Sequence, residues 1–196
     1  MRRKDLHVLK NAGVTAWNVY RRGCSFIPDL SRANLSRLDL RGVDLSHSRL
    51  YRTNLSEADL RGASFKGTDL TETSLWCANL EGANLQWVSL YGTYQVEVNL
   101  RAADLRGADL SYAHVKQACL RGATVKGTTF WGTRLQEVDL REVDLSDIGG
   151  EGPDFQKAVF ERVMVSADAA FWIYEAATRG AINSTGIQIT DVDDVD

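Results

Sequence analysis

The sequence predicts an all-β solenoid whose backbone winds in four-sided coils, with a helix at each end. A large apolar residue recurs at every fifth position from Leu30 to Leu145, and a small residue stands two places before most of these centres. A period of five fits neither an α-helix, where five residues turn through about 500°, nor a single strand, where side chains alternate. A backbone that bends after every five residues brings all these side chains to one core.

The spacing of the arginines gives the number of sides in a coil. Five arginines that directly follow a central leucine are separated by multiples of twenty residues: Arg41, Arg61, Arg101, Arg121 and Arg141. Only Arg106 stands at the same place in another phase. One charged row with this period implies four sides of five residues, and therefore a square cross-section.

Residues 1–27 are expected to form an N-terminal helical cap. Leu6, Leu9, Ala16 or Trp17, and Tyr20 recur near helical spacing, which predicts a helix over residues 5–21 despite Gly13. The open end of a solenoid exposes unpaired backbone groups and apolar side chains, so a cap is required there.

Residues 28–167 are predicted to form the β-helix, with about seven coils. Two stretches are irregular. In residues 93–97, Gln95 occupies a central position, and in residues 148–152 the sequence IGGEG offers no apolar centre. We count the second stretch as a distorted side of a coil.

Residues 168–196 are predicted to close the other end with a cap helix and an acidic tail. Asp168 is a candidate N-cap and Gly180 a C-terminal stop, and a short strand is expected through Ile187 and Ile189. The helix contains four large apolar residues in succession: Phe171, Trp172, Ile173 and Tyr174. Consecutive residues lie about 100° apart on a helix, so one face cannot bury all four. A homodimer through them is favoured over a monomer whose tail covers them.

The repeated pattern resembles that of the pentapeptide-repeat proteins. It reads A(D/N)LxG, as in ADLRG at 58–62 and 103–107 and in ANLEG at 78–82, and the phrase AWNVYRR before the first coil is similar to a leader found on many bacterial members. The resemblance covers residues 28–167. It implies a right-handed quadrilateral β-helix whose central residues point inward, and it does not imply an enzyme.

Catalysis, cofactors and metals find no support in the sequence. His7, His47 and His114 lie far apart, and none has a nucleophile and a carboxylate at a recognisable spacing. The three cysteines show neither CxxC nor Cys/His spacing, so we expect reduced thiols and no zinc site. There is no apolar run of the length of a membrane span and no signal peptide of the usual type, so a cytoplasmic location is expected.

Exposed aromatic residues are the candidate interface. Seven large side chains fall at outward positions around the middle of the shaft: Trp76, Trp87, Tyr91, Tyr94, Val96, Tyr112 and Trp131. Contiguous apolar patches commonly mark interfaces, which favours a protein-binding surface. The alternative is that a distortion at Gln95 turns Tyr94 or Val96 inward and leaves the other rings scattered singly.

The charge distribution weighs against nucleic-acid binding and DNA mimicry. The face with the arginine row also carries carboxylates that balance it, so internal pairing is favoured over phosphate binding. The formal charge is +5 over residues 1–27, −3 over residues 28–167 and −5 over residues 168–196. Some relatives mimic DNA and bind DNA gyrase, which requires a strongly anionic shaft. The sequence therefore favours a non-enzymatic bacterial scaffold for an unknown protein partner; the alternatives are a DNA mimic that inhibits or protects gyrase and a regulatory cap on a larger assembly.

Overall fold

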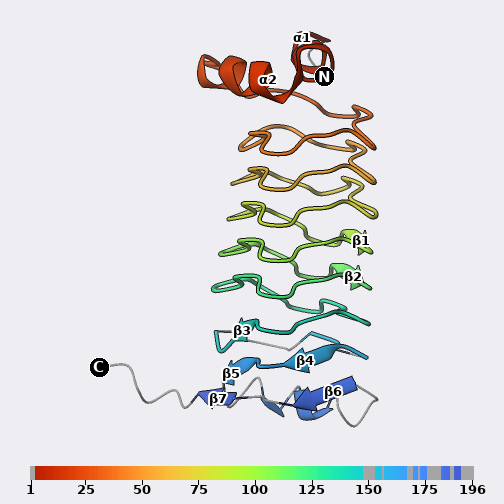
Figure 1. Cartoon of the computed structure of the whole chain (residues 1–196), viewed down its shortest axis with the longest axis vertical. Coiled ribbons are helices and arrows are strands. Elements are labelled where there is room, and N and C mark those ends of the chain that lie inside the picture. Colours follow the sequence, from red (N-terminus) through yellow and green to blue (C-terminus); the bar gives the residue numbers. More distant parts are fainter. Residues whose placement is uncertain are drawn as a thin grey trace, which may run out of the picture.

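The protein is a column of stacked coils with helices across its N-terminal end, as Figure 1 shows. A computed structural model describes residues 3–147, 153–155, 157–166, 170–171, 173–175, 182–185 and 188–190. The helical segment comprises α1 (Arg3–His7), the π-helical turn η1 (Val8–Ala12) and α2 (Gly13–Arg22). The strands are β1 (Tyr94–Val96), β2 (His114–Lys116), β3 (Asp144–Leu145), β4 (Val159–Glu161), β5 (Met164–Ser166), β6 (Ile182–Thr185) and β7 (Gln188–Thr190).

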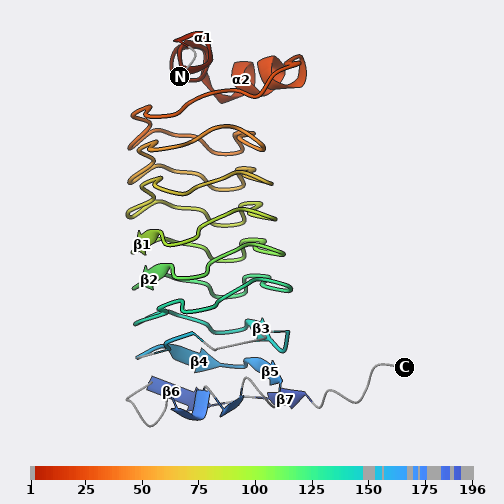
Figure 2. The same ribbon diagram turned by 180° about the vertical axis from the view of Figure 1, so that it is seen from behind.

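The coils pair in a parallel register of twenty residues, as the arginine spacing predicts. Along one side, the chain of bridges runs from Asp39 to Asp59, then through Asn79, Asn99 and further positions to Val159. The longer strands keep the same arrangement, because β1 pairs with β2, β3 with β5, and β5 with β7, all in parallel. Seen from behind in Figure 2, the coils stack without a change of direction down to β4 and β5. The four-sided coil is thus a property of the described structure.

The core is a single column of leucines and other apolar residues inside the coils. The central residues from Leu30 to Leu145 are almost completely buried, and so are the small residues two places before most of them. A tight turn separates successive sides, as at Leu60, whose carbonyl accepts a hydrogen bond from Ala63 N at 3.0 Å. Gly62 in this turn has φ +64°, a left-handed conformation that glycine adopts without steric cost.

Gln95 keeps its place in the core. Its side chain is only 2% exposed, while Tyr94 beside it is 68% exposed and Val96 is half-buried. The side containing these residues forms β1 instead of a short bridge. The alternative in which a distortion turns Tyr94 inward is therefore wrong. The amide nitrogen and oxygen of Gln95 have no hydrogen-bond partner among the described residues.

The N-terminal segment is helical, as predicted, but it is not one straight helix. Gly13 has φ +80° and ψ 178°, which is not a helical conformation, and the axis changes direction there, so that α1 and α2 run in different directions in Figure 1. Trp17 on α2 is completely buried, and Leu9 joins the same core.

Side chains of α2 pair with the exposed backbone edge of the first coil. Inside the stack, the equivalent groups pair with the preceding coil. The carbonyl of Ser64, for example, accepts a hydrogen bond from Leu45 N in the preceding coil at 2.7 Å. No coil precedes Asp44. Instead, Trp17 Nε1 donates to Asp44 O at 2.7 Å, and Asn18 Oδ1 accepts from Asp44 N at 2.9 Å. The helix therefore takes the place of a coil for these two backbone groups.

A buried carboxylate likewise pairs with a backbone N–H at the start of the first coil. Asp5 is fully buried; its Oδ2 accepts from Asp29 N at 2.9 Å and its Oδ1 from the Tyr20 hydroxyl at 2.7 Å. Burial and the bond to Asp5 raise the pKa of Tyr20. Arg21 also donates to the carbonyl of Ser46.

At the C-terminal end, the ladder continues beyond the predicted shaft. Ala170, Phe171 and Ile173–Glu175 are helical, and β6 and β7 pair in parallel with β4 and β5. The strand predicted around Ile189 is β7, whereas β6 was not foreseen. Residues 148–152, Asp168, Trp172, Gly180 and Ile187 lie outside the described residues.

Candidate protein-interaction surface

Three aromatic rings form a continuous strip along one corner of the column. Tyr91 and Trp131 directly follow central residues, and Tyr112 stands one place further into its turn. The twenty-residue register brings the three into successive coils. The ring centroids of Tyr91 and Tyr112 are 5.5 Å apart, and those of Tyr112 and Trp131 are 5.3 Å apart. We call Tyr91, Tyr112 and Trp131 the ring strip.

The ring strip is held in place but remains accessible. Its members are 51%, 42% and 49% exposed, in chain order. Tilted and edge-on ring pairs at these distances stabilise each other, so each side chain is partly ordered by the next. Large rings at solvent positions that are already ordered lose little conformational entropy when a partner covers them.

A second column of planar side chains lies beside the strip. Tyr94, His114 and Arg134 occupy the same position in successive coils. The rings of Tyr94 and His114 are 4.6 Å apart. Burial, followed by the nearby Arg134 charge, lowers the pKa of His114. A lowered pKa favours the neutral form of the imidazole that stacks on the Tyr94 ring.

A hollow adjoins the N-terminal end of both columns. It has a volume of about 350 Å³ and lies between the side chains of residues 71–74 and those of residues 91–94. Tyr91 and Tyr94 contribute to its lining. The equivalent positions in the preceding coil hold the smaller side chains of Thr71 and Ser74. Because small side chains in one coil adjoin large rings in the next, the surface at this corner is recessed, unlike a flat sheet face.

The structure separates the remaining predicted interface residues from the strip. Trp87 lies over Gly107 at a different turn, since a Cβ placed on that glycine would meet its ring. Trp76 and Val96 follow the central positions of the next side. In the described part of the chain, no ring contact joins Trp76 or Trp87 to the strip. Sequence reasoning missed His114 and Arg134, although the twenty-residue register places both in the row of Tyr94.

Four of the five arginines in the row are internally paired, as the charge balance predicts: Arg41, Arg61, Arg121 and Arg141. Arg41 contacts Asp39 at 2.6 Å and Asp59 at 3.7 Å, and Arg61 contacts Asp59 at 2.6 Å. Further along the shaft, Arg121 pairs with Glu142, Arg141 with Asp139 and Arg106 with Asp104.

These pairs hold the carboxylates in their charged form. The hydrogen bond from Arg41 lowers the pKa of Asp39 to about 2, and Arg61 lowers that of Asp59. A carboxylate that is already neutralised by a guanidinium is a poor mimic of a DNA phosphate, and the guanidinium is a poor phosphate ligand.

The candidate catalytic and metal-binding side chains are not brought together. His7 bonds Asn11 on the N-terminal segment, His47 lies over Gly67, and His114 stacks on Tyr94. Among the described residues, no group of three or more His, Cys, Asp or Glu side chains could hold a metal ion. Cys24, Cys77 and Cys119 are free thiols. In that same part of the chain, no helix is long and apolar enough to cross a membrane.

The five-residue sides, the four-sided coils and the parallel pairing of successive coils define the protein as a β-solenoid repeat protein. The sequence model for pentapeptide repeats (8 copies) matches residues 29–67, 48–86, 63–94, 96–127 and 118–148. The chain therefore belongs to the pentapeptide-repeat family.

Solved structures of pentapeptide-repeat proteins resemble the chain at low identity. HetL, involved in heterocyst differentiation regulation in the cyanobacterium Nostoc sp. strain PCC 7120, is 20% identical over 91% of this chain and 96% of its own, with a TM-score of 0.37. A trypsin-treated form of QnrB1, a plasmid-mediated fluoroquinolone resistance protein, is 19% identical over 84% of this chain and 78% of its own, with a TM-score of 0.48. A protein from the Arabidopsis thaliana thylakoid lumen is 27% identical over 65% of this chain and 79% of its own, with a TM-score of 0.31. No curated protein sequence matches the chain.

Proposed function

We propose that the protein is a non-enzymatic scaffold of the bacterial cytoplasm that binds a protein partner through the ring strip. The observation that carries the proposal is the continuous contact of Tyr91, Tyr112 and Trp131 on an exposed corner. Aromatic residues are enriched at the centres of protein interfaces, where they bury much area and supply most of the binding energy. Three free cysteines fit a reducing compartment. We infer a right-handed winding of the coils, as in the family.

The rest of the shaft supports binding through this corner in preference to other faces. On the charged side of the column, Arg41, Arg61 and Arg141 are already paired with aspartates, so a partner would have to break these ion pairs to use them. Covering the ring strip removes apolar area from water without breaking any of these ion pairs. The geometry therefore favours a partner with an apolar ridge or groove that follows the long axis of the column.

The test is affinity capture from the native cell with three versions of the protein. One is unchanged, one carries Tyr91→Ala and Trp131→Ala in the ring strip, and the control carries Tyr51→Ala and Trp87→Ala. The control removes one tyrosine and one tryptophan that are also exposed but lie outside the strip. We expect a specific protein to be retained by the unchanged and control versions and lost from the strip variant.

Equal retention of the same partner by all three versions would contradict the proposal. A gyrase supercoiling assay belongs in the same experiment, because DNA mimicry is the alternative that the family suggests. We expect no inhibition or protection of gyrase at micromolar protein, since several carboxylates of the shaft, such as Asp39, Asp59 and Glu142, are paired with arginines. Stoichiometric modulation of supercoiling would show that a local row of carboxylates is sufficient.

A further inference from the structure

The backbone ladder is interrupted on one side of the column, between residues 122–127 and residues 142–147. Its normal form appears one coil earlier. There Thr124 N donates to Ala103 O at 2.9 Å, and Leu105 N donates to Thr124 O at 2.8 Å. These two bonds recur along this side, as in Asp104 N to Ala83 O at 2.9 Å.

The corresponding bonds to Asp144 are not made. All three residues concerned are described, and no backbone hydrogen bond joins Ala123 or Val125 to Asp144. The bridge that would pair Thr124 with Asp144 is also missing from this otherwise regular series. By the pattern of the preceding coils, the carbonyl of Ala123 and the N–H of Val125 face both backbone groups of Asp144 across the opening.

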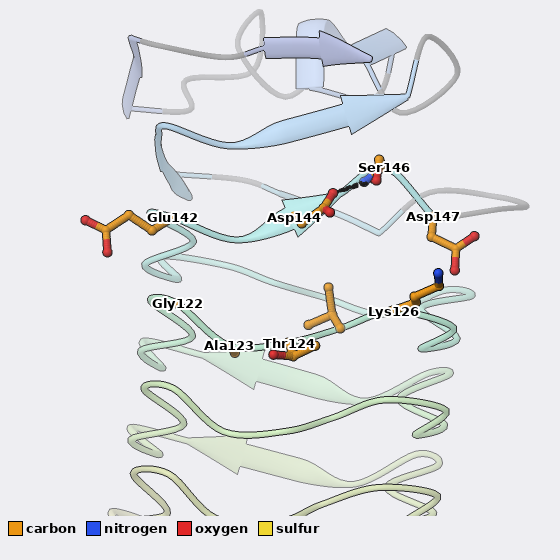
Figure 3. Close-up of a pocket in the computed structure, with 9 residues that line it drawn as sticks. Gly122, Ala123, Thr124, Lys126, Glu142, Asp144, Ser146 and Asp147 are labelled. Atoms are coloured by element: carbon orange, nitrogen blue, oxygen red, sulfur yellow. Dashed lines mark hydrogen bonds between the residues drawn. The ribbon is translucent and has the colours of Figure 1, made fainter. Parts of the chain in front are cut away.

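The opening forms a cavity of about 490 Å³, which Figure 3 shows in close-up. Its two ends are closed by polar contacts. At one end Gly122 N donates to Arg141 O at 3.0 Å, as in a regular ladder. At the other end Gly127 N donates to Asp147 Oδ2 at 3.1 Å, where the preceding coil uses a backbone carbonyl. Asp147 and Lys126 lie together at this second end, while Glu142 lies at the first (Figure 3).

We propose that this opening binds an extended peptide segment of a partner protein, with the sequence class apolar–basic–apolar. A segment that runs parallel to the coils presents the N–H and C=O of its middle residue to one neighbour and groups of its two flanking residues to the other. Three residues therefore satisfy all four facing groups of Ala123, Val125 and Asp144. Strand addition to exposed ladder groups is an established mode of peptide recognition.

The side chains around the opening specify the residue types. In this ladder the middle residue takes the outward position between Thr124 and Asp144, and its neighbours point inward, above Val125. The inward positions require apolar side chains. The outward one lies beside the Asp144 carboxylate, which among the described residues accepts only from Ser146, at 2.9 Å from the backbone N and 2.6 Å from Oγ.

The remaining charges agree with a basic middle residue. Glu142 is neutralised by Arg121 at 2.7 Å. Asp144 and Asp147 then leave an excess of negative charge over the single Lys126 at the rim of the cavity. Opposite charges at a partly desolvated rim guide a partner into one register and disfavour acidic segments.

The first test uses a fluorescein-labelled peptide with the core Gly-Val-Arg-Val-Gly, followed by fluorescence anisotropy. We expect saturable binding, with at least tenfold weaker binding of a Gly-Val-Glu-Val-Gly peptide and of the arginine peptide methylated at the arginine backbone nitrogen. Asp144→Asn should weaken binding of the arginine peptide. The matched control, Asp104→Asn, lies two coils before Asp144 on the same side, where the ladder is closed, and should leave binding unchanged.

The second test measures amide hydrogen exchange by NMR in the full chain. The Val125 and Asp144 amides should exchange faster than the paired amides of Leu105 and Asp104, and should become protected when the arginine peptide is added. Equal protection in the free protein would show a closed ladder and overturn the proposal. Fast exchange without peptide binding would mean that the opening holds water only, and equal binding of the methylated peptide would exclude strand addition. Protection that rises with protein concentration alone would assign the opening to a second copy. Each of these outcomes overturns the proposal.

Discussion

Replacing Trp17 by phenylalanine tests whether α2 completes the first coil. Trp17 is fully buried, and its Nε1 donates to Asp44 O at 2.7 Å. Phenylalanine keeps an aromatic ring but removes the donor, which leaves a carbonyl at the end of the stack without its partner. An unsatisfied buried polar group costs about 1–3 kcal/mol, and the smaller ring adds a cavity contribution of the same sign. We therefore expect the free energy of unfolding to fall by about 2–4 kcal/mol.

The assay is urea unfolding followed by circular dichroism, with Trp76→Phe as the matched control. Trp76 is about half exposed, so the same substitution there should change the free energy of unfolding by less than about 0.5 kcal/mol. Amide exchange locates the effect, since loss of the helix contacts should speed exchange in the first coil before it affects later coils. If Trp17→Phe and Trp76→Phe destabilise the protein equally, the indole hydrogen bond does not complete the coil.

Three further perturbations test other parts of the molecule. Gln95→Leu should raise the free energy of unfolding by about 1–3 kcal/mol in urea titrations, because it removes a buried amide that has no partner among the described residues; a decrease would show that the amide is satisfied. Arg106, with help from Gln86, lowers the pKa of Asp104 from 3.8 to about 2. The charged Asp104 carboxylate therefore stabilises the fold above about pH 4, and this contribution is lost as the pH falls toward 2. Asp104→Asn should reduce the dependence of the free energy of unfolding on pH over this interval; an unchanged dependence would contradict the pairing. Finally, we propose a homodimer through Phe171, Trp172, Ile173 and Tyr174, so light scattering should give a dimer mass that Trp172→Glu halves, and a monomer mass at every concentration would refute it.

The described residues of the C-terminal segment agree with the geometric reason for that last proposal. Ile173 is buried against the core, while Phe171 and Tyr174 are 63% and 68% exposed. Residues on a helix that lie one or two places apart point in different directions, so burying one leaves its neighbours in solvent. Two exposed rings at the end of a column form an apolar surface of the kind that twofold contacts cover.

The coil was predictable because its sequence signal is repeated. A central apolar residue at every fifth position fixes which side chains point inward, and the arginines at multiples of twenty fix how many sides close a coil. The bend at Gly13 was not predictable, since the apolar spacing on both sides of it fits one helix. The opening at Asp144 has no signal either, because Ala123, Val125 and Leu145 all fit the repeat.

The candidate interface was predictable as a set of residues but not as a surface. Exposure of each ring follows from its position in the five-residue unit. The contact of Tyr112 with both Tyr91 and Trp131 depends on how each ring tilts over the neighbouring coil, which the period does not determine. The Tyr112 ring itself rests on Gly132, twenty places later in the chain.

A glycine twenty residues after a large ring leaves space for that ring to pack on the next coil. A Cβ built on Gly107 would lie 2.3 Å from ring atoms of Trp87, and one built on Gly132 would lie 2.9 Å from the Tyr112 ring. At Gly62 and Gly92 the same construction meets no atom within 4 Å, so the close contact is specific to turns that follow a ring. A side chain at position 132 would therefore lift Tyr112 from the column. Because Tyr112 is the middle member of the ring strip, its displacement would separate Tyr91 from Trp131. The shape of the candidate interface thus depends on a glycine that no partner needs to touch.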